Sequence, residues 1–84
     1  MQPLTYQEAE CIIEKNEDLI GETINNFIVN DLRIDKVANT SSYCITVIYT
    51  PTIDAQMPSS TMELEEFCRT YNYLFRKGNC FDNQ

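Results

Sequence analysis

The side chains best suited to binding chemistry lie near the C-terminal end of this sequence. Two Arg, one Asn and one Tyr stand at positions i, i+3, i+4 and i+7, so a helix would place them on one face. Guanidinium groups, an amide and an aromatic ring can hold a carboxylate or phosphate and stack against a base. We expect a partner-binding face here, with a solvated helix face as the alternative. The four residues are Arg69, Asn72, Tyr73 and Arg76.

A second candidate surface is the acidic side of a helix predicted near the N-terminus. Carboxylates four residues apart on a helix lie about 6 Å apart, close to the separation of successive phosphates in a nucleic acid strand. Such a row can occupy the basic cleft of a nucleic-acid-binding protein, although a solvated helix face explains the same residues. The predicted partner-binding carboxylates are Glu10, Glu14, Glu17 and Asp18.

The overall charge favours the same class of partner. The 84 residues include 6 Lys and Arg against 13 Asp and Glu, which gives a net charge of −7. An acidic chain is repelled by nucleic acid phosphates and by anionic membranes, so we expect no direct binding to either. It is attracted to proteins with a basic surface.

The chain lacks the residues on which most catalytic and metal sites depend. It has no histidine, which removes the commonest general base and the commonest zinc ligand. The cysteines are widely spaced without a CxxC pair, and no glycine-rich or nucleophile motif occurs. We therefore predict no enzymatic activity, no catalytic residue, no metal and no cofactor. The four cysteines are Cys11, Cys44, Cys68 and Cys80.

The same cysteines bear on the cellular compartment. We see no basic segment followed by an apolar run, as in a secretory leader, and no stretch long enough to cross a membrane. Cysteines in a chain without such a leader are expected to be reduced. We predict a cytoplasmic protein with four free thiols.

Local patterns predict one helix followed by strands. A capping box at Thr5 and Glu8 begins the helix, which ends between Asn16 and Gly21. In the segment 27–35 the apolar phase changes, which indicates a strand with a bulge near residues 30–31. The clearest strand is 43–50, rich in β-branched and aromatic residues. One face of that strand is semi-apolar, and we predict self-association through it; its residues are Cys44, Thr46 and Ile48.

A second helix is predicted from Thr61 to Lys77, begun by a capping box at Ser60 and Glu63 and ended by Gly78. Its apolar stripe is expected to face the core. The core residues predicted on it are Phe67, Cys68, Tyr71, Leu74 and Phe75.

These elements predict a small α+β domain over residues 1–84, with a short tail at 79–84. We expect helix, antiparallel meander of two to three strands and helix, with both helices on one face of the sheet. The favoured function is a non-enzymatic interaction protein that inhibits or neutralises a macromolecule by occupying it, as an inhibitor, an immunity protein or antitoxin, or a phage counter-defence protein. The alternative is an oligomer that sequesters a nucleotide or another anion. A bare dimerisation module is a third possibility, and a homo-oligomer is expected.

Overall fold

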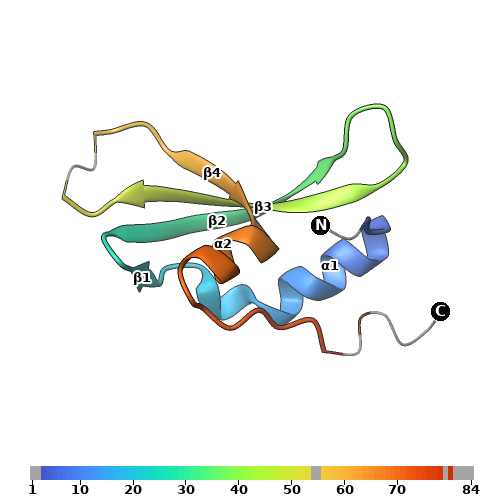
Figure 1. Cartoon of the computed structure of the whole chain (residues 1–84), viewed down its shortest axis with the longest axis horizontal. Coiled ribbons are helices and arrows are strands. Elements are labelled where there is room, and N and C mark those ends of the chain that lie inside the picture. The colour runs from blue at the N-terminus through green and yellow to red at the C-terminus, as the bar shows by residue number, and fades with distance from the viewer. Residues whose placement is uncertain (1–2, 54–55, 79, 81–84) are drawn as a thin grey trace.

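A computed structural model describes residues 3–53, 56–78 and 80 of the chain. The fold is a small α+β domain with an N-terminal helix, a four-stranded antiparallel meander curled into a half-barrel, and a C-terminal helix. Both helices cover the same face of the sheet (Figure 1). The predicted fold class is confirmed, with four strands in place of two to three. The elements are α1 (Tyr6–Lys15), the 3₁₀ helix η1 (Glu17–Leu19), β1 (Thr23–Ile24), β2 (Phe27–Lys36), β3 (Tyr43–Pro51), β4 (Ser60–Glu63) and α2 (Leu64–Thr70).

Helix α1 begins and ends where the sequence predicts. The Thr5 hydroxyl accepts the Glu8 backbone N–H, and the Glu8 carboxylate accepts the Thr5 N–H, so the capping box is complete. Asn16 is the C-cap, and Gly21 takes a left-handed φ of 91° just before β1. Ala9 and Ile12 lie about one helical turn apart, so they share one face of α1. Both are buried, so this is the face that packs on the core.

The sheet has the order β1-β2-β3-β4, with every neighbour antiparallel. Its register shifts between Val29 and Asp31, which confirms the bulge. The inward face of β3 carries buried Ile45, Val47 and Tyr49, as its alternation predicts. Leu4 extends the sheet by one bridge to Tyr43, so the residue just before the α1 capping box lies beside β3.

The predicted second helix is wrong at both ends. Residues Ser60–Glu63 form β4 against β3, and the Glu63 carboxylate caps α2 by accepting the Glu65 and Glu66 N–H groups. Tyr71 is the C-cap, and Asn72 has a left-handed φ of 56°, which ends the helix well before Gly78. Pairing with β3 therefore replaces the first turn of the predicted helix, and the residues of its last two predicted turns have an irregular conformation.

The core lies between the sheet and the two helices. Phe67 and Cys68 are buried, as predicted, and the rings of Phe67 and Tyr71 lie 4.8 Å apart. Tyr71 and Phe75 pack on the core partly buried, whereas Leu74 is 66% exposed. The prediction for Leu74 is wrong because it assumed a helix that has already ended.

Residues 71–80 form a segment we call the C-terminal strap, described here except for residue 79. The strap runs beside α1 (Figure 1), and a disulfide joins Cys80 to Cys11 of α1, with Cα atoms 5.7 Å apart. The prediction of four free thiols is therefore wrong for this pair. Cys44 and Cys68 are free. The predicted tail at 79–84 lies outside the described residues except for Cys80.

Candidate functional site

The basic and aromatic residues near the C-terminus do not share a helix face. Arg69 belongs to α2, whereas Asn72, Tyr73 and Arg76 lie on the strap. Their helical spacing loses its meaning because the left-handed Asn72 redirects the chain. Tyr73 packs on the core, and its N–H donates to the Cys68 carbonyl. The predicted stripe on one helix face therefore does not form, and partner binding by these residues stays a prediction.

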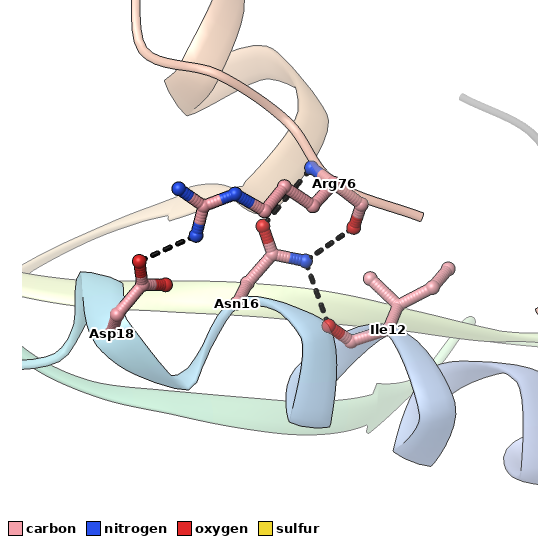
Figure 2. A network of polar contacts seen from close by, with 4 residues as sticks. All are labelled: Ile12, Asn16, Asp18 and Arg76. Carbon is pink, nitrogen blue, oxygen red and sulfur yellow. Dashed lines mark hydrogen bonds and ion pairs between the residues drawn. The ribbon is translucent and has the colours of Figure 1, made fainter. Parts of the chain in front are cut away.

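One predicted basic residue instead meets one predicted acidic residue. The Arg76 guanidinium forms an ion pair with the carboxylate of Asp18 in η1 (Figure 2). This hydrogen bond and the charge of Arg76 hold the pKa of Asp18 below its ordinary value of 3.8. The sequence predicted two separate binding surfaces, and the strap joins them at this contact.

Asn16 fixes the strap to the end of α1 from inside the molecule. Its amide nitrogen donates to the carbonyls of Ile12, at 2.7 Å, and Arg76, at 2.5 Å, and its oxygen accepts the Arg76 N–H at 3.1 Å (Figure 2). The side chain is only 2% exposed, so these bonds satisfy groups that water does not reach. The sequence interpretation missed this role. Its one signal was a polar residue on the apolar side of the helix.

The strap lies along one flank of α1. The disulfide at Cys11 and the aliphatic stem of Lys15 are both on this flank. An added Cβ at Gly78 would lie 2.9 Å from Cε of Lys15, so the strap runs against this stem. The opposite flank of α1 is left for other contacts.

On that opposite flank an open groove of about 480 Å³ lies between α1 and β2. Ile13 and Ile34, both partly buried against the core, form its apolar floor. Exposed Glu10 and Glu14 form its rim. The structure thus places Glu10 and Glu14, two of the four predicted carboxylates, beside one groove.

The acidic surface defined by Glu10, Glu14 and Glu17 is exposed on α1 and η1. Among the described residues, none of these three carboxylates forms an ion pair or a side-chain hydrogen bond, whereas the fourth predicted carboxylate, Asp18, is paired. Exposed carboxylates without a basic neighbour can attract an approaching cation. This surface is available to a basic partner.

The outer face of the sheet carries the three residues predicted for self-association. Cys44, Thr46 and Ile48 alternate on β3 and are half-buried. The Thr46 hydroxyl donates to the Asp35 carboxylate at 2.6 Å, and Arg33 pairs with that carboxylate at 2.9 Å. These contacts hold the pKa of Asp35 below its ordinary value. The face is thus part polar, and its self-association stays a prediction.

Neither free thiol has the environment of a nucleophile. Burial raises the pKa of Cys68 to about 11, and burial also raises the pKa of Cys44. A thiol reacts as its thiolate, so both are less reactive than an ordinary cysteine at neutral pH. Within the described ranges no group of three or more metal-ligating side chains occurs, and no helix there has the length and apolarity needed to span a membrane.

Comparison of the chain with protein-family models, with curated proteins and with solved structures finds no match in any of the three.

Proposed function

We propose that this chain is a non-enzymatic interaction protein that inhibits or neutralises a macromolecule with a basic surface by occupying that surface. The observation that carries the proposal is the acidic surface of Glu10, Glu14 and Glu17, exposed and without a basic partner among the described residues. A net charge of −7 adds long-range attraction to a basic partner.

Two lines of support concern the manner of action. The acidic surface lies on a helix and a 3₁₀ helix fixed by Asn16 and by packing on the sheet, so it is preorganised for binding. The raised pKa values of Cys44 and Cys68 argue against thiol catalysis. Inhibitor, immunity or antitoxin, and phage counter-defence proteins all act in this way, and we propose this group without choosing among them.

We also propose a cytoplasmic location. That expectation depended partly on reduced cysteines, and Cys11 and Cys80 are bonded. Structural disulfides are typical of oxidising compartments. Counting free thiols in the protein isolated under thiol-trapping conditions tests it: four free thiols support the proposal, and two contradict it.

The alternative, an oligomer that sequesters a nucleotide or another anion, has weaker support. It required Arg69, Tyr73 and Arg76 to converge on one ligand, but Arg76 is paired with Asp18 and Arg69 lies on another element. A thermal-shift screen with nucleotides tests it directly, because a bound ligand raises the unfolding temperature.

The test of the main proposal is affinity capture from the organism that encodes the chain, followed by titration of the purified captured protein. We expect Glu10→Gln/Glu14→Gln to weaken binding about tenfold or more, as expected for losing two interfacial charges. The matched control is Glu65→Gln/Glu66→Gln, which removes the same charge from α2 and should change the affinity little. Raising the salt concentration should weaken binding to the wild type. Equal affinities for both double variants, or binding insensitive to salt, would overturn the proposal.

A further inference from the structure

In the part of the chain that the structure describes, one edge of β2 has no partner strand along its second half. Strand β1 covers only the first two residues of β2, and the loop before β1 bonds to Val29. From Asp31 to Lys36, none of the described backbone groups pairs with this edge. The Leu32 N–H is satisfied locally by the Asp31 carboxylate at 2.9 Å. An open strand edge is a template for another strand.

The groups that face this edge follow from the ladder on the other side. The Tyr43 N–H donates to the Leu4 carbonyl, so it points away from β2, and Tyr43 and Lys36 form a non-hydrogen-bonded pair. Because hydrogen-bonded and non-hydrogen-bonded pairs alternate, the backbone groups of Lys36, Ile34 and Leu32 all point to the free edge. Their side chains share the face that carries the core.

We infer that a second copy of this chain pairs with this edge, antiparallel, with the two-fold axis at Ile34. In that register the N–H and C=O of Ile34 exchange two hydrogen bonds with Ile34 of the second copy. The Lys36 N–H of each copy donates to the Leu32 carbonyl of the other. These four bonds leave the contact between Asp31 and Leu32 in place, so the interface forms without disrupting the fold.

The charged side chains of Arg33 and Asp35 on β2 select this register. Arg33 lies opposite Asp35 of the second copy, and this pair occurs twice because the interface is two-fold symmetric. Moving the axis by one residue in either direction would place Arg33 opposite Arg33, or Asp35 opposite Asp35. Like charges directly opposite one another destabilise a strand pair. An axis at Leu32 would also place Arg33 opposite an Asp, but there the Leu32 N–H that would face the second copy is already bonded to the Asp31 carboxylate.

The groove between α1 and β2 gives the second copy an apolar contact. Ile34 lies both at the axis and on the groove floor beside Ile13, so Ile34 of the second copy covers this floor. Glu10 and Glu14 line the rim of the same groove, whereas the proposed contacts use its floor and the strand edge. This interface differs from the outer face of Cys44, Thr46 and Ile48.

The test is sedimentation equilibrium over a wide concentration range with two charge variants. Arg33→Asp alone and Asp35→Arg alone each place like charges opposite one another in a homodimer, and each should raise the dimer dissociation constant about tenfold or more. An equimolar mixture of the two variants restores both opposite-charge pairs, so it should form a heterodimer. Circular dichroism checks that each variant is folded.

Ile48→Lys is the control, because it changes the outer face and leaves the β2 edge intact. A wild type dimer, weakened in each single charge variant, recovered in the mixture and unchanged by Ile48→Lys, would support the inference. A wild type that stays monomeric at every concentration would overturn it. Loss of the dimer only in Ile48→Lys would also overturn it, and would place self-association on the outer face.

Discussion

Replacing Asn16 with alanine removes the three hydrogen bonds that join the end of α1 to the strap. Each such bond contributes about 1 kcal/mol net to folding, and the site is closed to water because Asn16 is only 2% exposed. The backbone groups of Ile12 and Arg76 would lose their partners. We therefore expect Asn16→Ala to lower the free energy of unfolding by about 3 kcal/mol.

That loss is large for a chain of this size. Domains have about 0.05–0.15 kcal/mol of stability per residue, which gives about 4–13 kcal/mol for 84 residues. The midpoint of thermal unfolding should fall by about 12–24 °C, at about 4–8 °C for each kcal/mol. Urea denaturation followed by circular dichroism measures the change, with the disulfide kept intact in all samples. Asn26→Ala, at an exposed turn position, is the matched control and should change stability by less than about 0.5 kcal/mol.

Asn16→Asp separates the hydrogen bonds from simple loss of volume. The new carboxylate would face the carbonyl oxygens of Ile12 and Arg76, where Asn16 now places a donor. Burial and these oxygens raise the pKa of the new carboxyl group, so its stability deficit is smallest below the pKa of the unfolded chain and grows as pH rises through the folded value. A variant as stable as the wild type at neutral pH would refute the reasoning, as would an Asn16→Ala change below about 1 kcal/mol.

Three further predictions concern the strap and the ionisable groups. Cys11→Ser should lower the free energy of unfolding by up to about 4 kcal/mol under oxidising conditions, because the disulfide closes a loop with a sequence separation of 69, and should leave the reduced protein almost unchanged in urea titrations. The pKa of Asp18 lies below 3.8 in the folded state, so the stability that its pairing with Arg76 gives is present above pH 3.8 and is lost as pH falls through the folded pKa. Asp18→Asn should therefore reduce the loss of stability in this acidic pH range. An unchanged pH dependence would contradict the pairing. The pKa of Cys68 is raised from 9.0 to about 11, so the contribution of this thiol to stability is present below pH 9 and is lost between pH 9 and 11. Alkylation of the native protein near pH 8 should label Cys44 before Cys68. The reverse order would show that Cys68 is not buried.

The elements that depend on local signals could be predicted from the sequence. The capping box at Thr5 and the C-cap at Asn16 are short-range patterns that no long-range contact overrides. The bulge after Val29 follows from the change of apolar phase in one strand. The class of fold follows from the order of these elements.

The errors lie where a long-range contact decides between two local alternatives. Residues Ser60–Glu63 fit a capping box, yet they pair with β3, because Glu63 can cap α2 from the last position of a strand. Beyond Tyr71 the helical spacing continued in the sequence, but Asn72 takes a left-handed conformation and the strap turns toward α1. The backbone of Arg76 in the strap bonds to the side chain of Asn16, 60 residues away in sequence, and no local pattern predicts such a partner.

In the candidate site, too, the sequence predicted local neighbours and missed long-range contacts. Spacing on one helix predicted that Glu10 and Glu14 lie near each other, and they share the rim of one groove. Spacing could not predict that Asp18 would be neutralised by Arg76 or that Cys11 would bond to Cys80, because both contacts depend on the path of the strap. The predicted acidic surface is therefore smaller than its four carboxylates suggested.

One flank of α1 carries both the proposed acidic surface and the groove that a second copy would cover. A chain this short buries little more than about 60% of its unfolded surface, and the strap covers only the flank that carries Cys11 and Lys15. The other flank keeps an apolar floor, which a second copy would cover, beside a strand edge that none of the described backbone groups pairs, and an acidic rim around that floor. Variants at Arg33 and Asp35 should therefore change self-association without changing the rim, and variants at Glu10 and Glu14 should do the opposite. If both pairs of variants changed both properties together, the groove would be a single binding site and the two proposals would have to be merged.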